Sequence, residues 1–98
     1  MFTGTLTADL LLGDVHSLKG KRAVVRPILA ELRRRFDVAA AEVGSTELHR
    51  RTQVGVATVA GEAGHVADVL DACERLLADR PEVTLLSTHR RLFSDTDQ

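Results

Sequence analysis

The chain has 98 residues with 44% hydrophobic and 28% charged side chains and a formal net charge of −1, which indicates one folded domain and excludes a disordered or strongly basic chain. Cys73 is the single cysteine, so no disulfide can form within the chain, and no apolar stretch approaches the roughly 20 residues that a membrane-spanning helix needs. The N-terminus lacks the basic start and apolar run of a signal peptide. We therefore expect a cytoplasmic protein without a membrane partner.

The first half of the chain predicts a strand, a helix and a second strand. From residue 2 to residue 12, one face of the predicted strand is largely apolar and the other largely polar, which indicates a single buried face. Ser17 is a favourable N-cap for a helix over 18–36, where apolar side chains recur at helical spacing. Pro27 lies inside this helix and predicts a kink, because proline cannot donate a backbone hydrogen bond. Residues 37–43, which precede a turn, predict the second strand.

The second half of the chain predicts the same order of a strand, a helix and a strand. Residues 51–60 are rich in Val and Thr and predict a third strand. Apolar side chains at helical spacing over 64–78 predict a second helix, and Cys73 lies on this apolar stripe as a small core residue. Residues 83–92 predict a fourth strand, and the chain ends in a polar tail over 94–98.

This order of elements predicts an α+β fold. Each strand–helix–strand half needs a right-handed crossover. A ferredoxin-like βαββαβ sandwich satisfies both halves with a four-stranded antiparallel sheet and two helices on one face. We expect this single domain to cover residues 1–93, with Thr3, Thr5 and Thr7 on the open face of the sheet.

Positive charge is concentrated in the first predicted helix. Residues 17–36 hold seven of the 13 Lys and Arg residues and a single acid, Glu31, so this segment carries a formal charge of +6 and the rest of the chain −7. At about 100° per residue, four of these cations lie along one side of the helix, beside the apolar stripe. Such a row fits a phosphate backbone, and it fits an ordinary solvated helix face equally well. The candidate RNA-binding residues are Lys19, Lys21, Arg22, Arg26 and Arg33.

The familiar RNA-recognition motif shares this order of strands and helices, but it stacks bases on aromatic side chains of its sheet. Strand 51–60 has no aromatic residue, and the open face on the first strand carries threonines. RNA binding would therefore depend on charge and shape. The same open face is also a candidate surface for a homodimer.

The sequence contains no pattern of catalytic or metal-binding residues. The four histidines are dispersed, one cysteine cannot complete a zinc motif, and no glycine-rich phosphate loop is present. Two weak alternatives are an acid–base or metal cluster of His49 with Glu42 and Glu47, and the loop that holds Asp14 and His16. We expect no enzyme activity, no cofactor and no metal.

Three segments resemble the YlxP-like family of small bacterial proteins of unknown function: His-Ser-Leu-Lys-Gly-Lys-Arg at 16–22, Leu-Arg-Arg-Arg-Phe-Asp-Val at 32–38 and Ala-Glu-Val at 41–43. Weaker matches at 54–57 and 66–70 extend the resemblance over nearly the whole chain, without the tail. The resemblance implies a ferredoxin-like fold. It also implies a genomic setting among translation and ribosome-maturation factors, and it implies no catalytic residue.

Three hypotheses follow from the sequence. The leading hypothesis is a non-enzymatic binding protein whose basic helix contacts ribosomal RNA or a ribosome-assembly intermediate. The second is a dimeric protein–protein interaction module that pairs through its open sheet face and does not bind RNA, although both properties can occur together. A small-ligand sensor or an enzyme ranks last.

Overall fold

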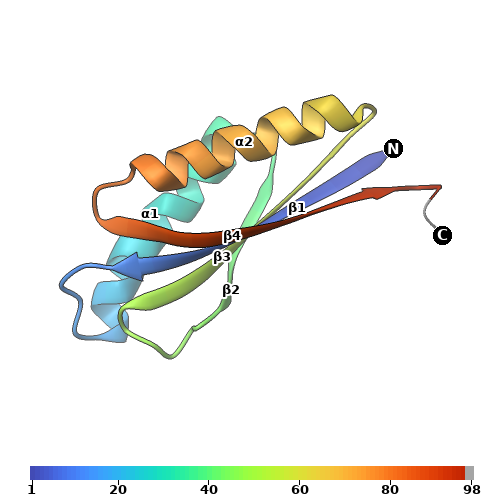
Figure 1. The fold of residues 1–98 in the computed structure, drawn as a ribbon. Coiled ribbons are helices and arrows are strands. Elements are labelled where there is room, and N and C mark those ends of the chain that lie inside the picture. The colour runs from blue at the N-terminus through green and yellow to red at the C-terminus, as the bar shows by residue number, and fades with distance from the viewer. Residues whose placement is uncertain (97–98) are drawn as a thin grey trace.

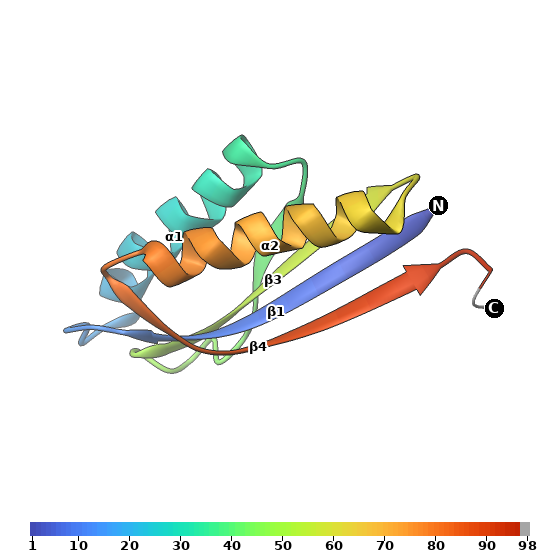
Figure 2. The same ribbon diagram turned by 45° about the horizontal axis from the view of Figure 1, so that its top comes forward.

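The computed structural model describes residues 1–96, and it has the predicted order of elements. Their bounds are β1 (Phe2–Leu12), α1 (Leu18–Arg35), β2 (Ala39–Gly44), β3 (Arg51–Ala60), α2 (Ala63–Asp79) and β4 (Val83–Ser94). The strands form one antiparallel sheet in the order β2-β3-β1-β4, and both helices cover the same face of it (Figures 1 and 2). The fold is therefore the ferredoxin-like α+β sandwich that the sequence predicts.

Two of the expected boundaries differ from the structure by two residues, and the other differences are of one residue. β2 begins at Ala39, two residues later than expected. β4 continues to Ser94, two residues further than expected, because β4 pairs with β1 as far as the Phe2–Ser94 pair. The first residue of the predicted tail therefore belongs to the sheet, and its last two residues, 97 and 98, lie outside the described part of the chain.

Helix α1 begins and ends where local chemistry favours it. The Ser17 side chain accepts a hydrogen bond from the Gly20 backbone N–H at 3.0 Å, which caps the first turn as predicted. The helix continues through Pro27 and ends at Arg35, because Phe36 has an extended backbone with φ of −131°. The kink expected at Pro27 stays a prediction.

The core lies between the sheet and the two helices. On β1, the inward residues Leu6, Ala8, Leu10 and Leu12 are completely buried, as the alternation of the sequence predicts. Gly4 continues this inward row, and a Cβ atom there would lie 2.2 Å from Val66 Cγ1 on α2. The absence of a side chain at this position therefore lets α2 pack directly on β1.

Cys73 is a core residue, as expected from its place on the apolar stripe of α2. It is fully buried, and burial raises the pKa of its thiol, while the charge of Arg90 acts in the opposite direction. Because the thiolate is the nucleophilic form, this cysteine is held in its unreactive state.

Candidate nucleic-acid interface on helix α1

Four exposed cations lie on the outer side of α1. Lys19, Arg22 and Arg26 come from the candidate set, and Arg34 extends their row towards the C-terminal end of the helix. Within residues 1–96, none of the four makes a hydrogen bond, an ion pair or a ring contact. Their positive charges therefore face solvent without a neutralising partner.

Arg33 has a partial partner. Its Nε donates a hydrogen bond to the Ala40 carbonyl oxygen at 3.1 Å, and its Nη2 donates to the same oxygen. The residue is exposed as a whole, and its charge is not neutralised by an acid. Arg33 thus adds positive charge to the surface while its guanidinium group ties α1 to strand β2.

Lys21 does not lie on this surface. Only 2% of the residue is exposed, and its Nζ lies 2.8 Å from Glu42 Oε2 and 2.6 Å from the Ser45 carbonyl oxygen. Glu42 Oε2 also accepts a hydrogen bond from the Thr52 hydroxyl at 2.6 Å. Two residues beyond Lys19, a side chain is turned by about 200° around the helix, which points Lys21 at the core. We therefore remove Lys21 from the candidate phosphate contacts.

Arg34 was missed in the sequence because only the narrow row beside the apolar stripe was considered. Fifteen residues after Lys19, it lies about 60° away from it around the helix, still on the solvent side. Its position around the helix, away from the apolar positions, could have indicated that Arg34 is exposed. The outer face of α1 thus carries a broader band of positive charge than the predicted row.

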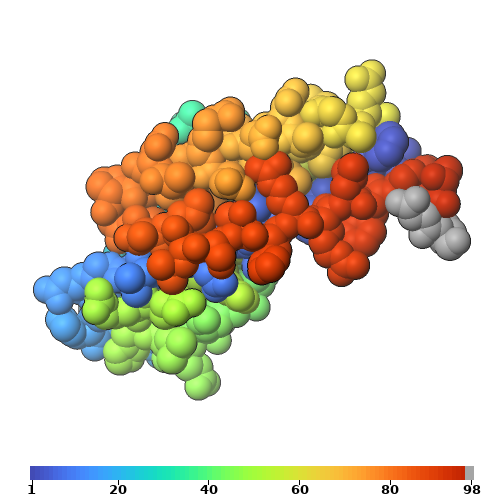
Figure 3. All heavy atoms as spheres, in the orientation of Figure 1, coloured from blue at the N-terminus to red at the C-terminus, as the bar shows by residue number. Residues whose placement is uncertain are grey.

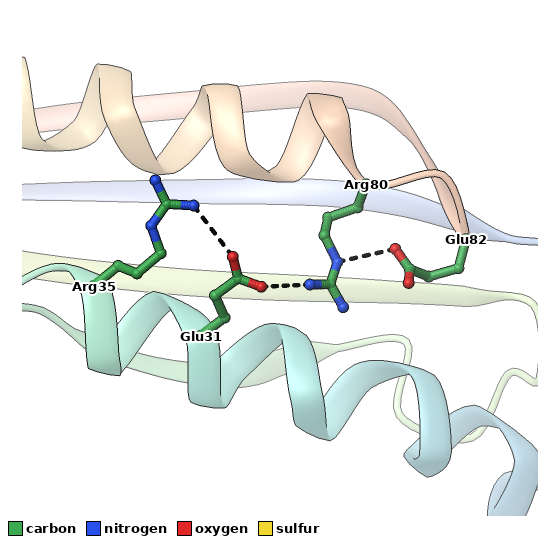
Figure 4. Close-up of polar contacts among 4 residues, drawn as sticks. All are labelled: Glu31, Arg35, Arg80 and Glu82. Atoms are coloured by element: carbon green, nitrogen blue, oxygen red, sulfur yellow. Dashed lines mark hydrogen bonds and ion pairs between the residues drawn. The ribbon is translucent and has the colours of Figure 1, made fainter.

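Two arginines at the junction of the helices, Arg35 and Arg80, are paired with acids. Glu31 on α1 accepts hydrogen bonds from Arg35, at 3.2 Å, and from Arg80 just after α2. Arg80 also donates to Glu82 at 2.9 Å, so the four side chains form a continuous ionic chain across the helix junction (Figure 4). Arg80 thus links the end of α2 to α1, and both arginines differ from the outer band in having acidic partners.

The two weak acid–base candidates do not assemble into a site. Glu42 is occupied by Lys21 and Thr52. His16 Nε2 lies 2.5 Å from Asp14 Oδ1, but both side chains are more than 80% exposed. No three His, Cys, Asp or Glu residues in the described part of the chain are grouped so that they could hold a metal ion. Neither helix of residues 1–96 is long and apolar enough to cross a membrane.

The open face of the sheet has a shallow hollow of about 460 Å³. Its floor is made of small side chains from three strands, namely Thr5, Thr7, Ala39, Ala41, Gly55 and Ala57. Val43 lines it as well and is 56% exposed, and Val59 on the same face is 61% exposed. This apolar surface is the second feature of the molecule that could meet a partner.

The fold, together with the cation band of α1, defines a small α+β protein with one basic helix. Residues 3–90 match the family described as "Protein of unknown function (DUF503)", and the chain belongs to this family. The chain is also 28% identical over 90 residues to the "Uncharacterized protein YlxP" of Bacillus subtilis (strain 168), a match that covers 92% of this chain and 98% of that protein. The resemblance to YlxP-like proteins of unknown function is confirmed.

Proposed function

We propose that this protein is a binding protein that contacts ribosomal RNA, or a ribosome-assembly intermediate, through the outer face of α1. One observation carries the proposal. Of the 13 Lys and Arg residues of the chain, only five make no hydrogen bond, ion pair or ring contact within residues 1–96, and four of those five lie on α1. The fifth is Arg75 on α2.

The dimensions of this cation band suit a nucleic acid backbone. Lys19 and Arg34 are fifteen residues apart, which corresponds to about 22 Å along a helix axis. Four cations that meet four phosphates would give a fall of log affinity with log salt at a slope of about −3. The genomic setting implied by the YlxP-like resemblance agrees with a partner in the translation machinery and supports a location in the cytoplasm.

Co-sedimentation with ribosomal fractions from the protein's own cells tests this proposal. The wild-type protein is expected to sediment with one ribosomal subunit at low salt and to dissociate at high salt. The variant Arg22→Glu/Arg26→Glu is expected to remain at the top of the gradient.

The matched control is Arg75→Glu/Arg91→Glu, which makes the same change of net charge at exposed positions on α2 and β4. We expect this control to sediment like the wild type. Wild-type protein that stays at the top of the gradient at low salt would refute the proposal. Equal loss of co-sedimentation in both variants would show that net charge, and not the position of the cations on α1, determines the association.

The open sheet face supports a second candidate function, a homodimer that acts in protein–protein contacts. Its hollow is lined by small and apolar side chains, and the Asp9–Arg51 pair at 3.8 Å balances charge beside it. Two copies could therefore meet face to face over these small side chains. Sedimentation equilibrium tests this candidate: a dimer is expected for the wild type and a monomer for Ala41→Glu, whereas a monomeric wild type would exclude it.

A further inference from the structure

The loop between β2 and β3, residues 45–50, is held against α1 by a buried lysine. Lys21 Nζ donates to the Ser45 carbonyl oxygen at 2.6 Å, and the Leu48 backbone N–H donates to the same oxygen at 3.2 Å. Ser45 adopts a positive φ of 56°, a conformation that costs energy for a residue other than glycine. The beginning of this loop is therefore fixed relative to the first two turns of α1.

The other end of the loop is tied to the connection between β1 and α1. Arg50 Nε donates to the Gly13 carbonyl oxygen at 2.8 Å, and the Leu12 backbone N–H donates to the Arg50 carbonyl oxygen at 2.8 Å. The two connections lie side by side at one end of the molecule, where blue and green atoms meet in Figure 3. Loop 45–50 is thus held at both ends, at the same end of the molecule as the N-terminal part of α1.

Burial of the Lys21 ammonium group costs free energy that its partners must offset. An ammonium group removed from water is destabilising without close partners, and a well-packed apolar side chain at such a position is often at least as stable. Here the partners of the ammonium are Glu42 and the loop carbonyl of Ser45. Lys21 therefore fixes the start of the loop against the first two turns of α1, which also carry the exposed Lys19 and Arg22.

Loop 45–50 offers hydrogen bonds and no net charge. Thr46 and His49 are exposed, and each carries a side chain that can donate or accept a hydrogen bond. The charges of Glu47 and Arg50 cancel, so the loop adds nothing to the attraction of phosphates. Such a surface suits a neutral group that both donates and accepts, and the ribose 2′-hydroxyl is such a group.

Among residues 1–96, no aromatic side chain lies at this end of the molecule to stack on unpaired bases. Phe36 is half-buried against the core. Phe2 and Phe93 lie on the paired ends of β1 and β4, next to the N-terminus and far from loop 45–50 (Figure 1). Single-stranded RNA is recognised mainly by stacking on rings, whereas double-helical RNA presents 2′-hydroxyls in a wide, shallow minor groove.

We propose that the RNA bound by this surface is double-helical and that Thr46 and His49 contact its 2′-hydroxyls while the cations of α1 contact its phosphates. Lys21 is the positioning residue that holds loop 45–50 in place for this contact. The inference rests on the proposed function of α1, and it adds discrimination of RNA from DNA to that function.

Binding of three probes tests the inference: a short duplex RNA, the duplex DNA of the same sequence, and one strand of the RNA. Two hydrogen bonds to 2′-hydroxyls are expected to give the wild type about a tenfold preference for duplex RNA over duplex DNA. Thr46→Ala/His49→Ala is expected to lower the affinity for duplex RNA to that for DNA. Its affinity for DNA should not change, because the cations of α1 are intact.

A second variant separates positioning from contact. Lys21→Met/Glu42→Gln leaves net charge unchanged and keeps an oxygen acceptor for the Thr52 hydroxyl, but it removes the tie to Ser45. We expect it to lose the preference for RNA while its affinity for DNA stays that of the wild type. Its folding is checked by thermal unfolding, and if it does not fold, the exposed Thr46→Ala/His49→Ala variant decides alone.

Thr84→Ala/His65→Ala, which removes one exposed threonine and one exposed histidine elsewhere, is the matched control and should keep the preference. Equal wild-type affinity for duplex RNA and duplex DNA would overturn the inference, as would tighter binding of the single strand or an unchanged preference in the Thr46→Ala/His49→Ala variant. In all these cases the proposed function of α1 would stand. Binding to none of the probes would overturn this inference, and co-sedimentation with ribosomal fractions would then decide on the proposed function separately.

Discussion

Two arginine-rich regions of this protein share a helix and differ in what their charges do. On the outer face of α1 the cations have no partner within residues 1–96, whereas at the junction with α2 every arginine of the ionic chain in Figure 4 is matched by an acid. Arg34 and Arg35 are neighbours in sequence and belong to different regions, because one helix position turns a side chain by about 100°. Helical phase, and not the number of charges, decides which cations are available.

Lys21 is a third case within the same helix. It is flanked by exposed cations in the sequence, yet it is buried and paired with Glu42. The three environments should respond differently to substitution, and stability and RNA binding should separate them.

The largest loss of stability is expected for Lys21→Met. It leaves Glu42 without its cation and the Ser45 carbonyl without its donor, which should lower the free energy of unfolding by about 3 kcal/mol. Urea unfolding at pH 7 measures this change. Lys21→Met/Glu42→Gln should recover much of the loss, since no carboxylate is then left unpaired, and a single variant as stable as the wild type would contradict the expectation.

A smaller effect is expected for Arg80→Ala. Arg80 bridges Glu31 and Glu82, and its side chain is about one-fifth exposed. Loss of both pairs should lower the free energy of unfolding by about 1 kcal/mol, because partly solvated ion pairs contribute little. Arg75→Ala, at the unpaired arginine of α2, serves as the control in the same urea experiment. Equal stability of the two variants would contradict the expectation that a paired arginine contributes more to stability than an unpaired one.

The smallest effect on stability is expected for Arg22→Ala/Arg26→Ala. These side chains make no contact within the described part of the chain, and alanine favours helix, so stability should change by at most about 0.5 kcal/mol. RNA affinity should nevertheless fall, because two phosphate contacts are lost. A melting temperature well below that of the wild type would show that these arginines support the fold instead.

The fold could be predicted because its signals are local. The division of β1 into an apolar and a polar face, the Ser17 cap and the apolar stripes of both helices each depend on residues close together in the sequence. The end of β4 could not be placed in this way, since it is set by pairing with β1 more than 80 residues earlier. The sequence also did not determine which side of β2 faces the core. In the structure, Ala40 and Glu42 point inward.

The candidate interface was predictable only in part for the same reason. The exposure of Lys19, Arg22 and Arg26 could be predicted, because the helical period places them outside the apolar stripe. The burial of Lys21 depends on an acid and a carbonyl that are 21 and 24 residues away in the chain. No periodic pattern reports such a contact, although the angle of Lys21 around the helix did point towards the apolar side.

The hydrogen bonds from Arg33 to Ala40 have a consequence for how molecules of this protein behave at high concentration. β2 is a six-residue strand at the edge of the sheet, and strand edges are where sheets of different molecules join and aggregate. Arg33 places a charged guanidinium group directly on the main chain of that edge and so makes it a poor template for an incoming strand. The helix that we propose to recognise RNA also protects the β2 edge from pairing with a strand of another molecule.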